Sequence, residues 1–334
     1  IPVFGPSKAV AQLEGSKVFA KDLMKKYNIP TAAYGVFHKV DEAKEFIGQT
    51  GAPIVVKADG LAAGKGVVVA MTIEEANAAV EEMLSGNRFG EAGSTVVIEE
   101  FMEGEEASLL AFVDGKTVVP MIASQDHKRI FDGDKGPNTG GMGTYAPAPV
   151  LTDALRDEAM KTILEPLVAA MEKEGMPYVG CLYAGLMITP QGPKVVEFNA
   201  RFGDPETQVV LPLLDSDLGQ IMMACATGTL TADMVKWKDS SAACVILASK
   251  GYPETSSKGD VIHGDIKQHD TTIVFHSGTK LIGDEYVTNG GRVLGVVGLG
   301  KDLRTALDRA YERIAHTDFE GMQYRTDIGA KAFK

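Results

Sequence analysis

A short stretch near the middle of the chain, residues 194–208, constrains its fold and chemistry most strongly. It reads Lys-Val-Val-Glu-Phe-Asn-Ala-Arg-Phe-Gly-Asp-Pro-Glu-Thr-Gln, and the β-branched and aromatic residues at its start predict a strand. Because successive strand side chains point to opposite faces, we expect Glu197, Asn199 and Arg201 to project together. Mg²⁺ accepts carboxylate and amide oxygens alongside water and substrate phosphates, and a guanidinium suits an anion beside it. The stretch therefore predicts a platform for metal and phosphate.

The end of the same stretch favours the start of a helix. Asp204 is a typical N-cap residue and Pro205 a typical first helical residue, so the helix would aim its backbone N–H groups toward the platform. The alternation alone leaves another interpretation open. Glu197 and Arg201 could form a solvated ion pair on an exposed sheet face, with Asp204 acting only as a cap.

Length and composition exclude several classes of protein. With 334 residues the chain is long enough for two or three domains, and 45% hydrophobic with 23% charged residues is typical of a globular protein. A net charge of −12 disfavours non-specific nucleic-acid binding, and no apolar window is long enough for a membrane span. No signal peptide is predicted. The three cysteines are widely spaced, which favours reduced thiols in the cytoplasm.

A glycine-rich link at residues 59–66 is the second informative stretch. It joins predicted strands at 52–58 and 67–70. Glycine lets backbone N–H groups approach phosphate oxygens closely, and neighbouring lysines add positive charge. These residues are Gly60, Gly64 and Gly66 with Lys57 and Lys65. The spacing and the strand that follows differ from a Walker A loop. We predict a hinged flap over a nucleotide, and an ordinary β-hairpin remains the alternative.

Two further segments complete a possible nucleotide site. A helix predicted over residues 7–27 carries Lys17 and Lys21 four positions apart, which on their own are typical of a solvated helix face. A strand at 96–102 runs into the acidic segment 103–107. A hinge there would offer backbone groups to an adenine and a carboxylate to a ribose, although the acidic run by itself is more typical of a solvated loop.

Residues 124–149 have no periodicity and are too many for a simple connector, which indicates a functional loop. His127, Lys128 and Arg129 would supply the local positive charge that an acidic protein needs for an anionic substrate. A histidine with no functional role is the alternative for His127. Beyond this loop we predict a helix at 152–174 interrupted at Pro166, a strand pair at 181–188 and 194–200, and a β-rich tail that ends in a helix at 303–315.

In combination these stretches resemble those of the ATP-grasp ligases and, more narrowly, the glycinamide ribonucleotide synthetase family. The segments that carry the resemblance cover nearly the whole chain: 12–17, 57–66, 125–129, 136–143, 201–208 and 288–292. The runs Arg-Phe-Gly-Asp-Pro-Glu and Gly-Pro-Asn-Thr-Gly-Gly-Met-Gly are far more specific than any glycine spacing.

The resemblance implies an α+β ATP-grasp fold, in which two α+β subdomains grip ATP, with a β-rich C-terminal domain. It implies four parts: residues 1–20 as a linker and first helix after an N-terminal domain that the family normally has, 21–98 as the small subdomain with the flap, 99–234 as the large subdomain with the metal site, and 235–334 as the C-terminal domain. We expect the protein to be a monomer or a weak oligomer.

The resemblance also implies an activity: ATP-dependent ligation of glycine to 5-phosphoribosylamine through a glycyl phosphate, in purine biosynthesis. Lys17 and Lys57 would contact the phosphates under the flap. Glu99, Glu100, Phe101 and Met102 would face adenine, and Glu106 the ribose. Glu197 and Asn199 would hold Mg²⁺ or Mn²⁺. Arg201, Asp204, His127, Lys128 and Arg129 would bind glycine or the substrate phosphate.

One departure from relatives concerns the metal. Many ATP-grasp enzymes carry a further metal-binding carboxylate on the strand before Glu197, and residues 183–188 of this chain contain none. Two other hypotheses stay open: an ATP-grasp ligase for a different carboxylate, and an ATP-binding module without complete activity.

Overall fold

The computed structural model describes residues 1–60, 66–85 and 94–333 of the chain. They form two compact units, each assembled from segments that are distant in sequence. Unit 1 contains Ile1–Pro120, Leu151–Arg201 and Gly219–Ala232, and unit 2 contains Met121–Val150, Phe202–Leu218 and Asp233–Lys334.

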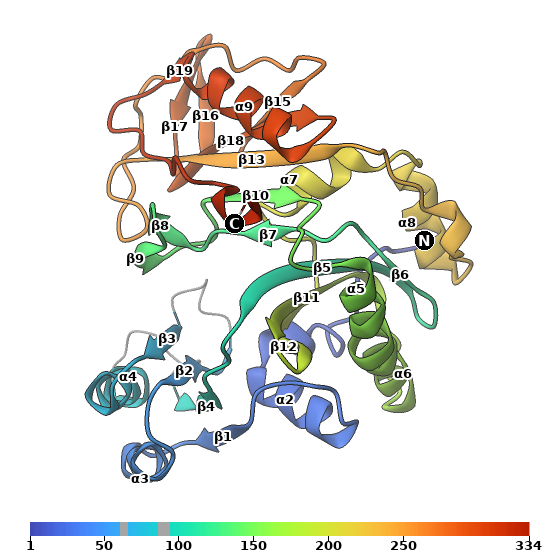
Figure 1. Cartoon of the computed structure of the whole chain (residues 1–334), viewed down its shortest axis with the longest axis vertical. Helices are drawn as coiled ribbons and strands as arrows, with labels where there is room; N and C mark the ends of the chain where they lie inside the picture. The colour runs from blue at the N-terminus through green and yellow to red at the C-terminus, as the bar shows by residue number, and fades with distance from the viewer. Residues whose placement is uncertain (61–65, 86–93, 334) are drawn as a thin grey trace. The chain divides into compact units, whose positions relative to one another are not determined.

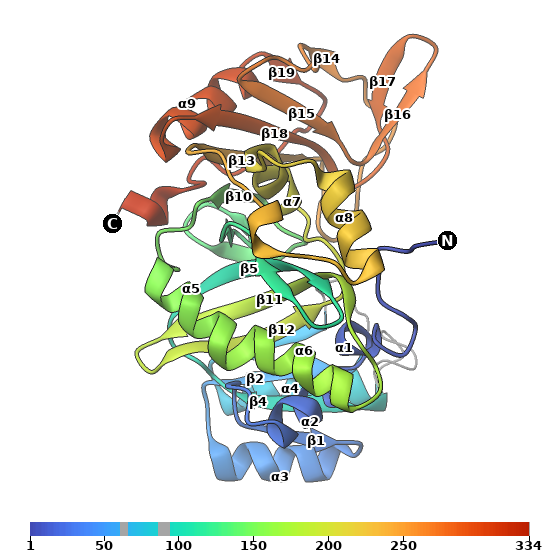
Figure 2. The same ribbon diagram turned by 90° about the vertical axis from the view of Figure 1, so that its right-hand side faces the viewer.

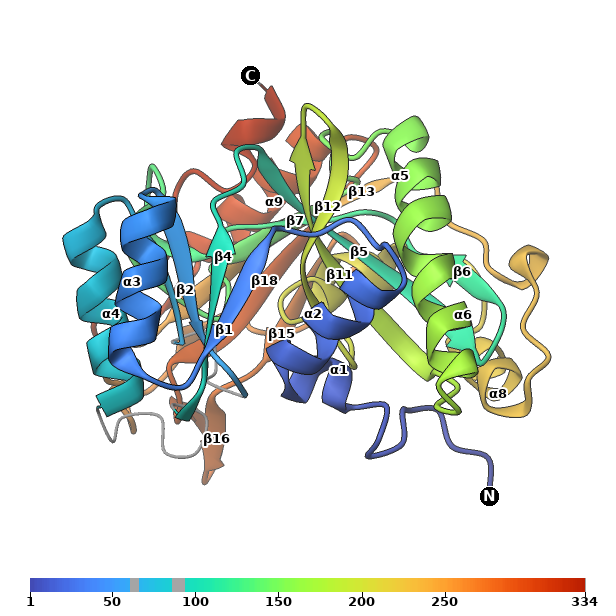
Figure 3. The same ribbon diagram turned by 90° about the horizontal axis from the view of Figure 1, so that it is seen from below.

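The first sheet of unit 1 has the antiparallel strand order β1–β4–β2–β3. Its elements are β1 (Tyr34–Phe37), α3 (Val40–Thr50), β2 (Ile54–Ala58), β3 (Val67–Ala70), α4 (Ile73–Ser85) and β4 (Val96–Glu100). Helices α3 and α4 lie side by side on one face of the sheet (Figure 3), where their apolar faces bury alternate residues of β2 and β4. The strands predicted on either side of the glycine-rich link are confirmed.

The second sheet of unit 1 has the order β12–β11–β5–β6. Its strands are β5 (Glu105–Asp114), β6 (Val118–Pro120), β11 (Val179–Thr189) and β12 (Gly192–Asn199). The hairpin between β5 and β6 turns at Gly115, whose φ of +105° favours glycine, and the Asp114 carboxylate accepts the N–H groups of Lys116 and Thr117. This sheet carries the candidate metal ligands.

A long helix runs along this second sheet (Figures 1 and 2). It consists of α5 (Asp153–Ala159), which contacts β12, a π-helical turn η2 (Met160–Leu164), and α6 (Glu165–Lys173). We expected the interruption at Pro166, but the wider turn lies before it. Proline lacks an N–H and crowds the carbonyl four residues earlier, and the π-helical turn accommodates both effects.

The prediction of one helix over residues 7–27 is wrong, because the chain breaks at Ser16 into α1 (Gln12–Gly15) and α2 (Lys17–Lys26). Ser16 is extended, and its hydroxyl accepts the N–H of Phe19 at 3.1 Å as the N-cap of α2. The Asp59 carboxylate accepts the N–H of Lys17 at 2.6 Å. The glycine-rich link therefore begins at a residue that is fixed to the start of α2.

Unit 2 is built on a five-stranded sheet of order β15–β18–β13–β10–β7. Helix α9 packs on β18 and β13 (Figure 2). A Cβ atom at Gly298 would lie 2.0 Å from the carbonyl oxygen of Ala306, so only glycine allows this close approach of helix and strand. The sheet strands are β7 (Gln125–Asp126), β10 (Gly143–Ala146), β13 (Ser241–Ala248), β15 (Thr272–His276) and β18 (Arg292–Gly300), and α9 spans Leu303–Ile314.

Smaller elements complete the chain. They are β8 (Arg129–Phe131), β9 (Lys135–Asn138), α7 (Thr207–Val210), η3 (Leu211–Leu213), α8 (Leu218–Thr227), η4 (Ala232–Met234), β14 (His263–Gly264), β16 (Thr279–Ile282), β17 (Glu285–Thr288), β19 (Thr317–Asp318) and η5 (Ala330–Phe333). In the part of the chain that the structure describes, no helix has both the length and the apolarity needed to cross a bilayer.

Candidate active site

A β-bulge in β12 determines where its polar side chains point. Gly185 of β11 pairs with Glu197, and the next residue, Leu186, pairs with Val195, so Val196 is the extra residue. Val195 and Phe198 are consequently both buried, although they are three positions apart. Glu197 and Asn199 are half-buried on the opposite face. Without the bulge, strand alternation would place these two side chains on the face of Val195.

The polar face of β12 continues across the neighbouring strands. Asn199 pairs with Tyr183 of β11, whose hydroxyl lies 2.9 Å from the Ser108 hydroxyl on β5. By the same register Glu106 of β5, which pairs with Met187, belongs to this face. The position directly opposite Glu197 is Gly185, so the neighbouring strand adds no carboxylate there.

Glu197 and Asn199 fit a magnesium site that is shared with a substrate. They offer two hard oxygen donors from one face of one strand, and Mg²⁺ is commonly held by one or two carboxylates together with water and substrate phosphates. Residues 1–60, 66–85 and 94–333 contain no group of three or more His, Cys, Asp or Glu side chains arranged to hold a metal ion alone. The donor set is therefore one that phosphate oxygens would complete.

Arg201 does not share this face, contrary to the prediction from alternation. β12 ends at Asn199, and the Arg201 guanidinium forms an ion pair with Glu14 at 3.0 Å. The Glu14 carboxylate also accepts the N–H of Ala200 at 2.9 Å. The alternation rule fails here because the chain leaves the sheet after Asn199.

A buried cluster of charged residues lies beside β12. Lys57 of β2 and Lys21 of α2 both contact the Glu99 carboxylate of β4, each at 3.0 Å, and all three side chains are at most 6% exposed. The interpretation of Lys21 as a residue of a solvated helix face is thus wrong. Glu99 was expected to face adenine, but its carboxylate lies between the two ammonium groups. The Lys57 ammonium also donates to the carbonyl of Val196, the bulge residue, at 3.1 Å.

Lys17 lies at the base of the glycine-rich link. Its ammonium donates to the carbonyl of Gly60 at 3.0 Å. Burial lowers the pKa of Lys17, and the nearby Glu197 carboxylate partly opposes this effect. At the other end of the link, the carbonyl of Gly66 accepts the N–H of Ala58 at 2.8 Å. Two other predicted flap residues, Gly64 and Lys65, lie outside the described residues.

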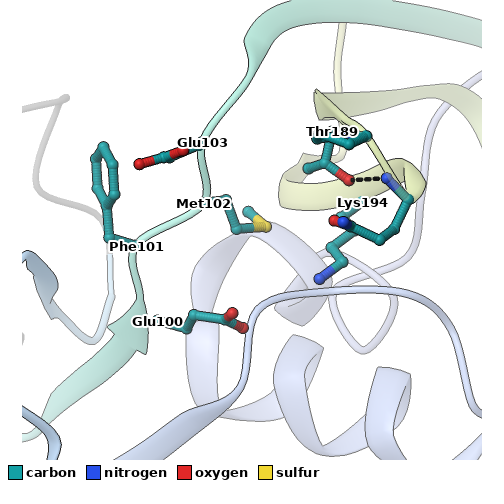
Figure 4. A pocket seen from close by; sticks show the side chains of 8 residues that line it. Glu100, Phe101, Met102, Glu103, Thr189 and Lys194 are labelled. Carbon is teal, nitrogen blue, oxygen red and sulfur yellow. Dashed lines mark hydrogen bonds between the residues drawn. The ribbon is translucent and has the colours of Figure 1, made fainter.

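A pocket of about 240 Å³ lies where the acidic hinge was predicted. One side is formed by residues 100–103, at the end of β4 and directly after it, and the other by the turn between β11 and β12 together with Lys194. Glu100 and Met102 project from the hinge toward the side of Lys194 and Thr189 (Figure 4). Lys194 is on the same face of β12 as Glu197, because the bulge lies between them. The pocket and the candidate metal ligands therefore share one face of the sheet. Its lining residues are Glu100, Phe101, Met102, Glu103, Thr189, Pro190, Gln191 and Lys194.

Unit 2 contains the predicted basic loop, and His127 there does not supply positive charge. His127 is 1% exposed, its Nδ1 lies 3.1 Å from the carbonyl of Gly143, and its Nε2 accepts the N–H of Gly329 at 3.4 Å. These contacts suit a neutral ring that carries its proton on Nδ1. Burial and the charge of Arg325 lower the pKa of His127 to about 4.

The neighbouring residues of the loop are held by their own hairpin. The Lys128 carbonyl accepts both the N–H and the hydroxyl of Thr139, and the Arg129 guanidinium donates to the carbonyl of Gly136 at 2.7 Å. The lysine and the arginine therefore remain the candidate cations of this loop.

Asp204 does not cap a helix, contrary to our prediction. Helix α7 begins three residues later with Glu206 as its N-cap residue. The Asp204 carboxylate instead accepts the Gln208 side-chain amide at 2.9 Å and pairs with Arg292 at 3.3 Å. Arg292 also donates to the carbonyls of Gly140 and Asp204. Arg292 thus ties segment 136–143 to the turn at Asp204.

Two groups in this region were not predicted from the sequence. Among the described residues, one buried carboxylate oxygen of Asp126 has no hydrogen-bond partner, and burial together with the nearby Glu206 raises the pKa of Asp126 well above the usual value. Arg292 lies in a segment that supported the resemblance but was given no role. The clustering of charged residues in the specific segments 125–129, 201–208 and 288–292 was the available signal for both.

Comparison with known families assigns the chain. The model of the phosphoribosylglycinamide synthetase ATP-grasp (A) domain matches residues 15–207, and that of the C domain of the same enzyme matches residues 242–331. The chain belongs to the phosphoribosylglycinamide synthetase family. Its fold is the α+β ATP-grasp fold with a β-rich C-terminal domain, as predicted.

Relatives of this family member cover almost all of its length. A phosphoribosylamine–glycine ligase of Halalkalibacterium halodurans is 54% identical over 330 residues, which is 99% of this chain and 77% of that enzyme. One from Neisseria meningitidis is 53% identical over 99% of this chain and 79% of its own length.

Solved structures agree with this assignment. The crystal structure of the Thermotoga maritima phosphoribosylamine–glycine ligase matches with a TM-score of 0.89 at 38% identity, covering 98% of this chain and 82% of that one. A biotin carboxylase domain of Hydrogenobacter thermophilus, solved with MgADP, matches with a TM-score of 0.76 at 18% identity over 97% of this chain and 70% of that one. The latter similarity concerns the fold alone.

Proposed function

We propose that this protein joins glycine to 5-phosphoribosylamine at the expense of ATP, giving glycinamide ribonucleotide, ADP and phosphate in purine biosynthesis. The observation that carries the proposal is the 54% identity to a phosphoribosylamine–glycine ligase over 99% of the chain. The geometry supports it, because one sheet face combines a pocket, a pair of hard oxygen ligands and a neighbouring lysine cluster.

The reaction has two steps. A carboxylate oxygen of glycine attacks the γ-phosphorus of ATP, which releases ADP and forms glycyl phosphate. The amine nitrogen of phosphoribosylamine then attacks the carbonyl carbon, phosphate leaves, and the nitrogen loses a proton. Positioning and positive charge contribute most to phosphoryl transfer, and shielding from water protects an acyl phosphate from hydrolysis.

The residues of unit 1 would bind ATP. The pocket at Glu100–Glu103 would take adenine and Glu106 the ribose. The ammonium groups of Lys57 and Lys17 would face the phosphates, and Glu197 with Asn199 would hold Mg²⁺ or Mn²⁺. When bound, the metal would supply charge that neutralises phosphate oxygens. In this revised proposal, Glu99 acts by orienting Lys57.

Glycine and 5-phosphoribosylamine would be bound by charged residues of segments 125–129 and 201–208. Arg201, Asp204, Lys128 and Arg129 are the proposed contacts for glycine and for the phosphate of phosphoribosylamine. His127 would instead fix the loop. The domain limits at residues 20, 98 and 234 also remain proposals.

We further propose a cytoplasmic protein that is a monomer or weak oligomer. All three cysteines are buried and unpaired, and burial raises the pKa of Cys225 to about 12. Unreactive thiols of this kind suit a reducing compartment.

The decisive experiment measures ADP release with glycine, 5-phosphoribosylamine and Mg²⁺, with the Halalkalibacterium enzyme as a positive control. We expect ADP release to require both substrates. Glu197→Gln should reduce it at least about 100-fold while the fold is retained. Glu165→Gln, at an exposed position of α6, is the matched control. ADP release supported by a different carboxylate, or unchanged in Glu197→Gln, would contradict the proposal.

A further inference from the structure

Lys21 is buried, charged and placed where it cannot contact a ligand directly. Its ammonium has three acceptors: the Glu99 carboxylate at 3.0 Å, the Thr31 hydroxyl at 2.8 Å and the carbonyl of Ala32 at 3.3 Å. A lysine ammonium has three N–H donors. All of them are used within the protein, so any effect of Lys21 on the reaction must pass through its neighbours.

Lys57 differs in this respect. Within the described residues its ammonium contacts the Glu99 carboxylate and the carbonyl of Val196, which leaves one of its three donors for a ligand. Two buried ammonium groups share one carboxylate, so this group of three residues has a net charge of +1. A phosphate oxygen at the remaining donor of Lys57 would balance that charge.

The same network reaches the bulge that orients Glu197. The Thr31 hydroxyl, which accepts from Lys21, donates to the carbonyl of Val195 at 2.7 Å. Lys57 donates to the carbonyl of Val196. The carbonyls of both residues before Glu197 are therefore held by side chains that contact either Lys21 or Glu99.

We propose that Lys21 is a positioning residue for the ligase reaction: through Glu99 it fixes the Lys57 ammonium, and through Thr31 it fixes the bulge that aims Glu197. This inference rests on the proposed function, because it assigns Lys21 a role in the ligase reaction, but its test measures nucleotide binding and does not require ligation. Lys21 would keep the Lys57 ammonium, which is proposed to bind phosphate, and the Glu197 carboxylate, which is proposed to bind the metal, at fixed positions relative to each other. It would do so without touching a substrate.

The charge of Lys21 provides a readout that a merely structural role would lack. Burial and, to a smaller extent, the charge of Lys57 lower the pKa of Lys21 to about 8, while Glu99 and Glu100 oppose the decrease. The Tyr34 ring also faces the ammonium, with its centroid 5.7 Å away. Lys21 is therefore charged at pH 7 and neutral at pH 9.5, where the net charge of the cluster falls to zero.

The test measures the Kd of a non-hydrolysable ATP analogue by calorimetry, with and without Mg²⁺, at pH 7 and pH 9.5. Lys21→Met should raise the Kd at least about tenfold at pH 7, because Glu99 then neutralises Lys57 alone. Wild type should show a similar rise between the two pH values. In Lys21→Arg, which stays charged at both, the rise should be absent.

Two more variants separate the roles. Lys25→Met removes a charge from the exposed side of the same helix and should leave the Kd unchanged. Thr31→Val keeps the charge and side-chain shape but removes the link to Val195. It should reduce the gain in affinity on adding Mg²⁺ while leaving the metal-free Kd unchanged, and it provides a test even if Lys21→Met does not fold.

Several results would overturn the inference. One is a Kd of Lys21→Met equal to that of Lys25→Met, whatever its melting temperature. Others are a pH effect that persists in Lys21→Arg, which would assign it to Lys17, and an unchanged Mg²⁺ gain in Thr31→Val. Failure of the proposed function would appear differently, as absent glycine ligation in a wild type whose nucleotide binding follows the pattern above.

Discussion

Replacing Arg325 with methionine should destabilise unit 2 by about 3 kcal/mol. The guanidinium is 1% exposed and donates to both oxygens of Asp327 at 2.7 Å and to Asp134 at 2.8 Å. Removing one partner of a buried ion pair costs about 3–5 kcal/mol. The lower end applies because both carboxylates are partly exposed, Asp134 retains its ion pair with Lys331, and Asp327 retains the N–H of Gly133.

The single tryptophan of the chain, Trp237, belongs to unit 2, so its emission reports the unfolding of that unit. At a urea slope of roughly 2 kcal/mol/M, a loss of 3 kcal/mol lowers the midpoint by about 1.5 M. Arg304→Met is the matched control, because Arg304 is exposed and stacks on the Phe333 ring. Its effect should stay below about 1 kcal/mol.

The pH dependence gives a second check. Burial acts to raise the pKa of Asp327, but the hydrogen bonds from Arg325 outweigh it and hold the pKa well below the ordinary value. The stabilisation is therefore present above the unfolded pKa of about 3.9 and is lost as pH falls through the folded pKa. The difference between wild type and Arg325→Met should be largest at neutral pH. Equal midpoints for the Arg325 and Arg304 variants at pH 7 would refute the reasoning.

Three further predictions concern buried or constrained positions. Gly141→Ala should lower the free energy of unfolding by at least about 2 kcal/mol, because φ is +113° and a Cβ would lie 2.4 Å from Pro205. Gly175→Ala, with φ +74° and open space around it, should lower it by only about 1 kcal/mol. Urea midpoints compare the two variants, and equal losses would contradict the steric argument. The pKa of His127 is about 4 in the folded protein, whereas that of an unfolded histidine is about 6.5. The free energy of unfolding of wild type should therefore fall by up to about 3 kcal/mol between pH 7 and pH 4, a loss that His127→Asn should not show. Parallel pH profiles of the urea midpoint for the two proteins would argue against a buried neutral ring. Glu99→Gln leaves two buried ammonium groups without a carboxylate and should cost about 3 kcal/mol, measured as thermal unfolding of unit 1 by circular dichroism; an unchanged transition would show that the cluster does not need its charge.

Local patterns in the sequence predicted the elements well. Strand alternation placed Glu197 and Asn199 on one face, and the glycine-rich stretch placed the link between β2 and β3. Each of these features depends on residues that are close in sequence. The errors came where a side chain finds its partner elsewhere. Lys21 meets Glu99 in another element, and the start of α2 is capped by the Ser16 hydroxyl and by the distant Asp59 carboxylate, which accepts the N–H of Lys17.

Charged residues were the most difficult to predict because residue type alone indicates exposure. The side chains of Lys21, Glu99 and Arg325 are almost completely buried. Each of them contacts an opposite charge, mostly from a distant segment of the chain. Burying a charge is costly unless such partners are present. Spacing in the sequence does not reveal such partners. His127 was expected to carry a positive charge for the same reason, because neither its burial nor the nearby charge of Arg325, which together keep it neutral, can be read from the sequence.

The bulge at Val196 connects these errors with the prediction that succeeded. A regular strand would have placed Glu197 on the face of buried Val195 and separated it from Lys194 and the pocket. The extra residue reverses this, and Val196 itself has no partner residue on β11. The carbonyls of Val195 and Val196 accept hydrogen bonds from Thr31 and Lys57. The irregular strand is thus held by Lys57 directly and by Lys21 through Thr31. If these lysines also supply the charge for phosphate, as we propose, the orientation of the metal ligands and the binding of nucleotide depend on one network.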